Sequence, residues 1–289
     1  MMKATKLGSL VAQLRDDVEL RCSLNSALGS IVLLSLTSFF LQHRFSALLL
    51  IALFSSLLSL AVYGRQQFWN ALQASLLGSV FSLSLLYAIR TDCTTTALIF
   101  TNYALSMAFF HYSEFIATAL TNRRNLNSSS YLLDHSLAYW IAALTSWLEF
   151  GVESYAFPSM KLVWMSRLGI VMVIFGEILR KLAMMHAQGG FTHLVALERR
   201  PEHVLVTNGV YGLVRHPGYL GWLVWCVGTQ VLLCNPICTL VYAFVAWNFF
   251  NDRIYWEEQY LVAFFGSQYL VYQQRVPTGI PFIKGFHTY

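Results

Sequence analysis

Two polar segments of the 289-residue chain flank one apolar block, and together they could form a site. The first, residues 208–221, reads Asn-Gly-Val-Tyr-Gly-Leu-Val-Arg-His-Pro-Gly-Tyr-Leu-Gly. It combines a turn signal with a proline suited to the first position of a helix. The free N–H groups of such a helix end can bind an anion, and Gly218 and Gly221 would let a ligand approach the backbone. A capped helix at a membrane interface accounts for the same residues equally well.

The second segment, residues 251–258, reads Asn-Asp-Arg-Ile-Tyr-Trp-Glu-Glu. Arg253 and Glu257 are four residues apart, so they share one face of a helix. An interfacial ion pair that contributes little stability is one interpretation. The other is a site in which Arg253 clamps a carboxylate through two hydrogen bonds and Glu257 accepts hydrogen bonds. Because both segments flank one hairpin and could meet in space, we favour the site.

Glu177 and Arg180 are further candidates, because ionisable residues inside an apolar segment are often functional. Glu177 can instead pair locally with Arg180 or Lys181, and Glu149 is a weaker candidate. The sequence lacks the nucleophile-elbow, H-E-x-x-H, Walker and G-x-G-x-x-G patterns. No two of its eight histidines are three or four residues apart, so we expect no metal site. We interpret Cys234 and Cys238 as packing residues, since two thiols alone make a poor zinc site.

The composition indicates a membrane protein with several spans. Hydrophobic residues make up 56% of the chain and charged residues only 11%, against roughly a quarter in an average soluble domain. These fractions exclude a disordered chain and an ordinary soluble domain. Five cysteines are too few for a disulfide scaffold. The basic residues are scattered rather than gathered in a stripe, so we expect no nucleic-acid partner.

Largely apolar stretches predict the membrane helices. The first six predicted spans are residues 22–43, 45–64, 66–89, 93–122, 135–152 and 162–185. The uncharged block 216–251 would be about 54 Å long as a single helix, which is too long for one crossing. Asn235-Pro236 in its middle predicts a break. We therefore predict an all-α polytopic membrane protein with about eight transmembrane helices, the last two forming a proline-interrupted hairpin.

The distribution of basic residues predicts the orientation. With a cytosolic N-terminus, 15 of the 19 basic residues fall on the cytosolic side, so both termini are expected there. No cleavable signal peptide is expected. We divide the chain into N-terminal helices, residues 1–160, and a catalytic region, residues 161–289. After its first helix, that region comprises a polar linker at 186–215, the hairpin at 216–251 and a cytosolic tail at 252–289.

The motif Arg215-His216-Pro217-Gly218-Tyr219 with the Arg253–Glu258 segment resembles the membrane methyltransferases of isoprenylcysteine and phospholipids. Two longer blocks are more specific. They are Gly-Thr-Gln-Val-Leu-Leu-Cys-Asn-Pro-Ile-Cys at 228–238 and Arg-Val-Pro-Thr-Gly-Ile-Pro-Phe-Ile-Lys-Gly at 275–285. Both resemble the animal-type isoprenylcysteine carboxyl methyltransferase family. The resemblance is strong from about residue 179 to 285 and covers little beyond hydropathy in the first four helices.

The resemblance implies an enzyme of the endoplasmic reticulum membrane that uses S-adenosylmethionine as methyl donor and no metal. Its substrates would be processed C-a-a-X proteins that end in a farnesyl- or geranylgeranylcysteine carboxylate. The donor pocket would be formed by the linker and both ends of the hairpin. The donor-binding positions it implies are Ala196, His203, Val204, Leu205, Val206, Tyr211, His216, Pro217, Gly218, Tyr219 and Glu257. Arg253 would bind the substrate and, with Arg180, orient its carboxylate. Ala196 stands where a glutamine is expected, so a side-chain contact to the donor would be missing.

The proposed chemistry fits a site without a catalytic His–Asp or Cys–His pair. A C-terminal carboxyl group has a pKa of about 3.5, so it is already an anion at cytosolic pH. A phospholipid N-methyltransferase would need a base for its amine, and a membrane sterol reductase would need a nicotinamide cofactor. The Val-Pro-Thr-Gly-Ile-Pro-Phe tail argues against both alternatives. A transporter would show repeated halves, which we do not find. The preferred prenyl group, the lipid-side entrance and the oligomeric state stay open.

Overall fold

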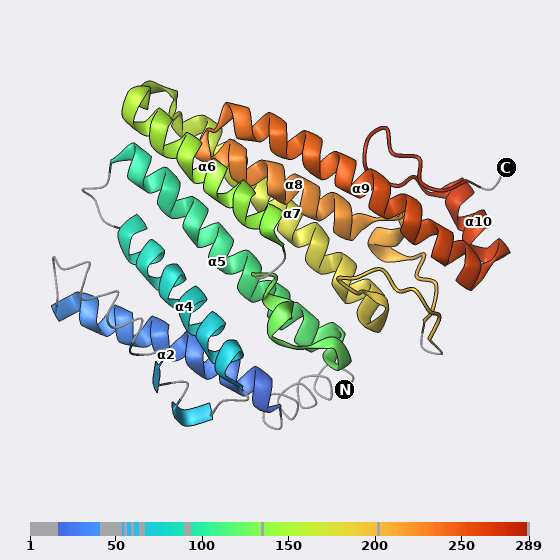
Figure 1. Ribbon diagram of the computed structural model, residues 1–289, viewed down its shortest axis with the longest axis horizontal. Helices are drawn as coiled ribbons and strands as arrows, with labels where there is room; N and C mark the ends of the chain where they lie inside the picture. The colour runs from blue at the N-terminus through green and yellow to red at the C-terminus, as the bar shows by residue number, and fades with distance from the viewer. Residues whose placement is uncertain are drawn as a thin grey trace. The chain divides into compact units, whose positions relative to one another are not determined.

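The computed structural model describes residues 17–40, 54, 57–58, 61–63, 67–89, 94–133, 136–200 and 203–287. The long helices are α2 (Val18–Phe40), α4 (Phe68–Ala88), α5 (Thr95–Thr121), α6 (Leu137–Ala156), α7 (Val163–Ala187), α8 (Pro217–Leu233), α9 (Pro236–Phe265) and α10 (Ser267–Arg275) (Figure 1). The short 3-10 helices are η2 (Arg123–Asn125), η3 (Ser128–Tyr131), η4 (Pro158–Met160), η5 (Gln188–Gly190) and η6 (Gly209–Gly212). All elements of the described ranges are helical, which confirms the predicted fold class at this level.

Five of the predicted spans coincide with α2, α4, α5, α6 and α7, whereas the span predicted at 45–64 lies largely outside the described residues. By length and composition alone, α4 is the one described helix that could cross a membrane. Helix α8 has only 17 residues, and α7 contains four charged residues. The count of eight membrane helices therefore stays a prediction.

The described residues fall into two compact units. The first lies within Met1–Thr94, Ala104–Ala119 and Leu126–Asp134, and the second within Thr95–Tyr103, Leu120–Asn125 and His135–Tyr289. Helix α5 thus contributes to both units. All residues of the predicted site belong to the second unit.

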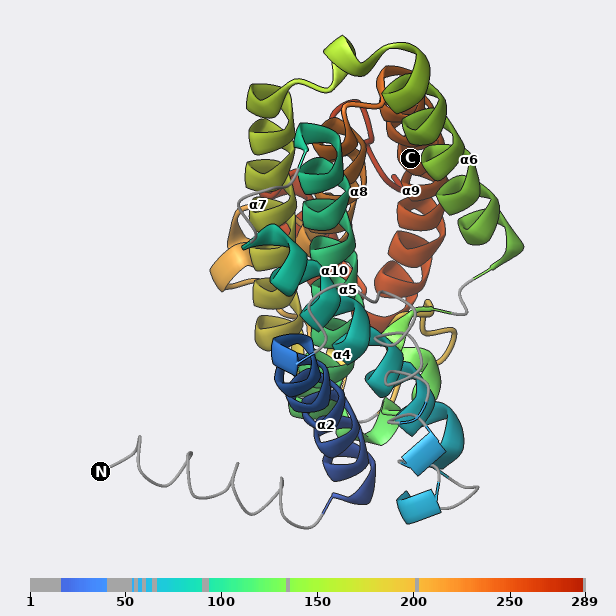
Figure 2. The ribbon, with the colours of Figure 1, turned by 90° about the vertical axis from the view of Figure 1, so that its left-hand side faces the viewer.

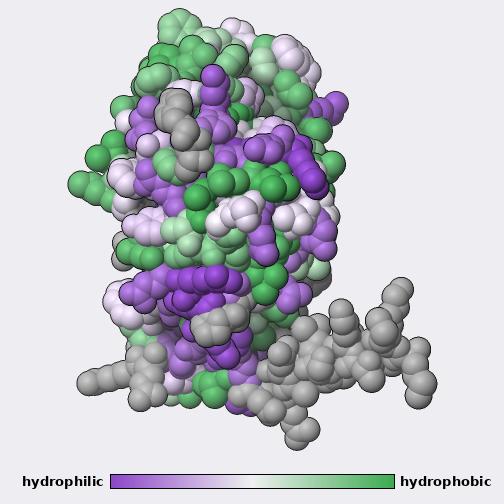
Figure 3. Space-filling view, turned by 90° about the vertical axis from the view of Figure 1, so that its right-hand side faces the viewer, coloured by the Kyte–Doolittle hydropathy of each residue, from purple (hydrophilic) through white to green (hydrophobic). Residues whose placement is uncertain are grey.

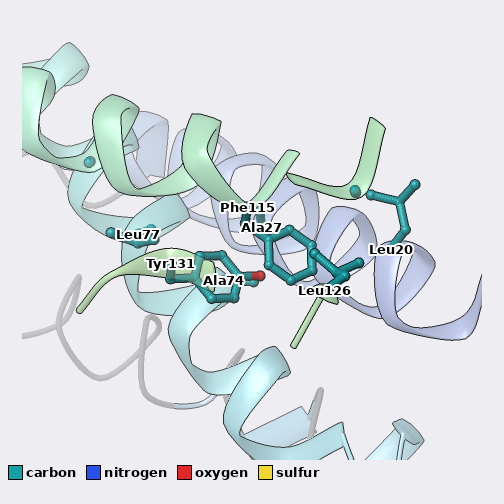
Figure 4. Packing of buried hydrophobic residues seen from close by; sticks show 9 residues of the cluster. Leu20, Ala27, Ala74, Leu77, Phe115, Leu126 and Tyr131 are labelled. Atoms are coloured by element: carbon teal, nitrogen blue, oxygen red, sulfur yellow. The ribbon is translucent and has the colours of Figure 1, made fainter. Parts of the chain in front are cut away.

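The core of the first unit is built around Tyr131, whose ring stacks on that of Phe115 with the centroids 4.3 Å apart (Figure 4). The Tyr131 hydroxyl donates to Asn70 Oδ1 at 2.9 Å and lies at hydrogen-bond distance, 2.7 Å, from the Ser23 hydroxyl. Its carbonyl oxygen lies 2.8 Å from Nδ1 of His111. Because a buried tyrosine needs partners for its polar atoms, these contacts fix the packing of α2 and α4 around the ring.

In the second unit, α7, α8 and α9 lie side by side in both views (Figures 1 and 2). Glycines let α7 and α8 approach backbone to backbone. A Cβ atom at Gly176 would lie 2.5 Å from the carbonyl oxygen of Gly221, and one at Gly221 would lie 2.8 Å from the backbone nitrogen of Arg180. This crossing holds Arg180 against the first turns of α8.

We predict that Gly176→Ala lowers the free energy of unfolding by about 1–3 kcal/mol, because its new methyl group would meet backbone that cannot move aside. Gly151 in α6 is the matched control, since nothing lies within 4 Å of a Cβ placed there. Gly151→Ala should be neutral or stabilising by up to about 1 kcal/mol. Thermal unfolding in detergent measures both, and equal midpoints would contradict the importance of the crossing.

The predicted break at Asn235-Pro236 is confirmed. Helix α8 ends in the left-handed conformation of Cys234, at φ 55°, and α9 begins at Pro236. Cys234 and Cys238 are buried free thiols. Helix α9 continues to Phe265, well beyond the predicted end of the hairpin at residue 251. The first part of the predicted tail is therefore helical, so the polar residues of the second segment project from a rigid element.

Charged side chains fasten the turn between α8 and α9. Glu149 accepts hydrogen bonds from the backbone N–H groups of Ile237 at 2.8 Å and Cys238 at 2.7 Å. A carboxylate is favourable there, because the start of a helix carries partial positive charge. The buried Lys161 ammonium group pairs with Glu153 at 2.7 Å and donates to a carbonyl at the end of α8 at 3.0 Å. Glu149, the weaker site candidate, therefore stabilises the hairpin together with the Lys161–Glu153 pair.

Candidate active site

A pocket lies in the second unit where the polar linker, the start of α8 and the last turns of α9 converge. Ten of the eleven predicted donor-binding residues line it: Ala196, His203, Val204, Leu205, Val206, Tyr211, His216, Gly218, Tyr219 and Glu257. Pro217 is the first residue of α8 and is not among the lining residues. The face that carries α10 shows hydrophilic and hydrophobic residues side by side (Figure 3).

Tyr219 joins the two predicted polar segments. Its hydroxyl donates to Glu257 Oε2 and accepts from Nε of Arg253 at 2.9 Å. The Arg253 guanidinium lies 5.5 Å from the centroid of the Tyr219 ring and also donates to the carbonyl oxygen of His193 in the linker. Tyr219 thus connects Arg253 to Glu257, although the family resemblance predicted it only as a donor-binding residue.

Arg180 lies behind the first turn of α8, where it is 5% exposed. Its Nη1 donates to the carbonyl oxygen of Gly218 at 3.3 Å, and its guanidinium lies 5.5 Å from the centroid of the Phe191 ring. Gly218 and Phe191 line the pocket, whereas neither Arg180 nor Arg253 is among its described lining residues. Both arginines therefore contact residues that line the pocket but do not line it themselves. Lys181 pairs with Glu177 at 3.1 Å, as the local interpretation predicted.

A second carboxylate, Glu258, is fully buried beside the pocket. Its Oε1 accepts hydrogen bonds from Arg215 Nε at 2.8 Å, His216 Nε2 at 3.0 Å and the Tyr269 hydroxyl at 3.0 Å. Its Oε2 accepts hydrogen bonds from Gln273 Nε2 at 3.1 Å and the Phe286 N–H at 2.9 Å. We call these residues the Glu258 cluster. It joins the start of α8, α9, α10 and the tail, so it fixes one wall of the pocket.

Arg215 extends the Glu258 cluster along the tail. Its guanidinium donates to the carbonyl oxygens of Gln273 at 3.1 Å, Val276 and Lys284 at 3.0 Å. Its backbone N–H donates to Pro277 at 2.8 Å. Because a buried guanidinium needs partners for all its N–H groups, Arg215 holds the tail against the end of the linker.

The Glu258 cluster predicts a defined pH dependence of stability. Burial raises the pKa of Glu258, but hydrogen bonds and charge from His216 and Arg215 outweigh burial and hold the pKa at about 2, below the ordinary 4.5. Because the pKa of Glu258 is lower in the folded protein than in the unfolded chain, the ionised carboxylate stabilises the fold. This contribution to stability is full above pH 4.5 and is lost as the pH falls toward 2. Unfolding midpoints of the wild type and Glu258→Gln across this range measure it. Parallel curves would contradict the prediction.

Glu258 and Arg215 were not among the predicted site residues, although both stand inside the motifs that carry the prediction. Arg215 directly precedes His216, a predicted donor-binding residue, and Glu258 directly follows Glu257. Two adjacent glutamates on one helix point about 100° apart, so their carboxylates can lie in different surroundings. That spacing was the available signal that the pair has divided roles.

Comparison with known proteins places this chain beside one family of methyltransferases. The model of the isoprenylcysteine carboxyl methyltransferase family matches residues 169–263. Protein-S-isoprenylcysteine O-methyltransferases are 47% identical in Xenopus laevis, over 84% of this chain and 83% of the relative, and 46% identical in Homo sapiens, over 85% of each. The relative in Arabidopsis thaliana, protein-S-isoprenylcysteine O-methyltransferase B, is 49% identical over 64% of this chain and 93% of its own length.

A solved structure is similar over nearly the whole chain. It is the eukaryotic intramembrane Ras methyltransferase, an isoprenylcysteine carboxyl methyltransferase, with a TM-score of 0.85 and 40% identity. The match covers 93% of this chain and 98% of the solved one. The fold and the site thus define a helical membrane enzyme with its pocket beside a helical hairpin. The chain belongs to the isoprenylcysteine carboxyl methyltransferase family and is a methyltransferase.

Proposed function

We propose that this enzyme transfers the methyl group of S-adenosylmethionine to the C-terminal carboxylate of proteins that end in farnesyl- or geranylgeranylcysteine. One observation carries the proposal: the residues that resemble the family's donor site, although separated in sequence, line a single pocket with Arg253 directly behind it. The names of the relatives support a prenylcysteine acceptor over a phospholipid amine or a sterol.

The residues of the pocket suit the proposed donor. S-adenosylmethionine supplies an electrophilic methyl group on a positively charged sulfonium. The aromatic rings of Tyr211 and Tyr219 favour a cation near their faces. The Glu257 carboxylate can accept hydrogen bonds from an ammonium group or from ribose hydroxyls. Within the described ranges no group of three His, Cys, Asp or Glu residues is arranged to hold a metal ion, and the proposed reaction uses none.

The side chains around the pocket suit a carboxylate acceptor. Such a group is ionised well below neutral pH, so no residue has to remove a proton from it. The task of the protein is to orient one carboxylate oxygen toward the methyl group and to keep water out. Arg253, fixed by Tyr219 and the His193 carbonyl, is our first candidate for that orientation, and Arg180 is the second.

The membrane setting fits the same substrate. The solved relative is an intramembrane enzyme, and this chain is a membrane protein of the same family. We propose eight membrane helices, location in the endoplasmic reticulum and cytosolic termini. A prenyl chain could then enter from the lipid between helices while its carboxylate reaches the pocket from the cytosolic side.

Purified protein in lipid or detergent with radiolabelled S-adenosylmethionine tests the function. N-acetyl-S-farnesylcysteine and phosphatidylethanolamine are offered together as competing acceptors. A base-labile methyl ester on the prenylcysteine is the expected result. Label on the lipid amine would transfer the assignment to phospholipid methylation. The absence of transfer to either acceptor, together with the absence of donor binding, would overturn the proposal.

A further inference from the structure

The tail carries an unusual exposed aromatic residue. The side chain of Phe282 is 93% exposed, and its φ of 67° lies in the left-handed region that costs energy for residues other than glycine. The turn around it is nevertheless firmly held. Thr278 Oγ1 donates to the carbonyl oxygen of Ile283 at 2.6 Å, and Trp247 Nε1 donates to that of Pro281 at 2.8 Å.

The base of this turn is part of the protein core. Ile280 and Ile283 are 3% and 5% exposed and pack against Phe250 and Ile254 of α9. Ile280 and Ile283 are thus buried on either side of the exposed pair Pro281-Phe282, and the ring of Phe282 points away from the protein. A strained backbone that presents an apolar ring to the surroundings indicates that the ring has a partner outside the chain.

The surroundings of Phe282 have the composition of a membrane interface. A groove beside it is lined by Asn251, Asp252, Tyr255, Trp256, Lys284 and Gly285. Aromatic rings and a lysine at the edge of an apolar surface are typical of the boundary between lipid tails and water. At about 100° per residue, Asp252 and Tyr255 lie on the face of α9 opposite to Glu257, which lines the main pocket, and Asn251 and Trp256 lie at the sides of that face.

The lipid-facing surface of α9 leads to this groove. Most of its exposed residues before the groove are apolar, among them Leu240 at 73%, Phe244 at 70% and Val245 at 58%, and Asn248 is the exposed polar exception. The first charged residue of the helix is Asp252, which lines the groove next to Phe282. In a membrane enzyme, Phe282 therefore lies at the level where the apolar surface of the hairpin ends.

We propose that the turn at residues 279–284, together with Tyr255 and Trp256, is a lipid-contact surface and that Phe282 inserts into the bilayer interface. The proposal rests on the membrane location of the family and not on the identity of the methyl acceptor. The tail beyond the turn is tied to the Glu258 cluster through the Lys284 carbonyl and the Phe286 N–H. Lipid contact would therefore set the depth of the pocket relative to the membrane surface.

An environment-sensitive fluorophore at position 282 tests the contact. The five native cysteines are replaced by alanine, Phe282→Cys is labelled with nitrobenzoxadiazole, and the protein is reconstituted into phosphatidylcholine vesicles. Gln274→Cys, on the exposed side of α10, is the matched control. We expect nitroxide on the upper acyl chains to quench the label at 282 several-fold more than at 274, and aqueous iodide to show the reverse. Equal iodide quenching at the two positions would overturn the proposal.

A second measurement keeps the native cysteines and an aromatic side chain. Benzoylphenylalanine replaces Phe282 or, as control, Gln274, and the vesicles are illuminated. A phospholipid adduct found by mass spectrometry at position 282 and not at 274 supports the contact. Adducts at both positions alike, or at neither, would contradict it. Neither readout depends on methyl transfer, so failure of this proposal is distinct from failure of the proposed function.

Discussion

Replacement of Arg253 by alanine is expected to lower kcat for methyl transfer to farnesylcysteine by about 100-fold or more. The affinity for the methyl donor should change much less, by about threefold at most. The reason is position: Arg253 is not among the described lining residues, yet Tyr219 and the His193 carbonyl hold its guanidinium directly beside the pocket. Single-turnover kinetics and equilibrium donor binding on the same preparation separate the two effects.

Two control variants distinguish whether Arg253 orients the substrate carboxylate or only shapes the pocket through its hydrogen bond to Tyr219. Tyr219→Phe removes the hydroxyl shared by Arg253 and Glu257 but leaves both charges in place. Arg253→Lys keeps the charge without the planar fork that binds a carboxylate through two hydrogen bonds. If Arg253 orients the carboxylate, the lysine variant should lose most of the activity and the phenylalanine variant much less. Equal loss of donor affinity in Arg253→Ala would instead assign Arg253 to the donor site.

Arg180 offers an internal comparison, because it is the other arginine next to the pocket. It is buried behind α8 and donates to the Gly218 carbonyl, so its removal would disturb both the helix start and any carboxylate nearby. A loss of stability together with activity would indicate that Arg180 positions the Gly218 turn. A loss of activity alone would make it a partner of Arg253.

The hairpin and the meeting of the two polar segments were predictable from sequence because their causes are local. Proline inside an apolar block interrupts the helical hydrogen bonds before it, and Asn235-Pro236 divides one such block into α8 and α9. A block folded back on itself brings its two flanks together. For that reason Tyr219 near the start of α8 and Arg253 on α9 come within hydrogen-bond distance.

The rest of the site depends on contacts between distant residues, which no local pattern encodes. A helix was predicted at Arg253 and Glu257, but its end at Phe265 was not, because the segment after residue 251 was assigned as a whole to the tail. The role of Arg215 depends on carbonyl groups of the tail more than 50 residues away. The close crossing of α7 and α8 at Gly176 and Gly221 requires a register that hydropathy does not define.

The two adjacent glutamates of α9 should give opposite phenotypes when each is changed to glutamine. Glu258 is the counter-charge of the buried Arg215, so Glu258→Gln leaves a buried guanidinium uncompensated and should cost about 3–5 kcal/mol of folding free energy. Glu257 lines the pocket, so Glu257→Gln should leave the stability within about 0.5 kcal/mol of the wild type. It should weaken donor binding by about tenfold through the loss of a charged hydrogen-bond acceptor.

Both variants change one carboxylate to an amide of the same shape, so the comparison isolates position from chemistry. Thermal unfolding with and without S-adenosylmethionine measures the two effects in one experiment, since a bound ligand raises the midpoint according to its affinity. Glu258→Gln should start from a lower midpoint, because the Glu258 cluster also fixes His216 and the tail. Glu257→Gln should start at the wild-type midpoint and gain less from the ligand. The same starting midpoint for the two variants would mean that Arg215 has another counter-charge and that the Glu258 cluster does not hold the pocket wall.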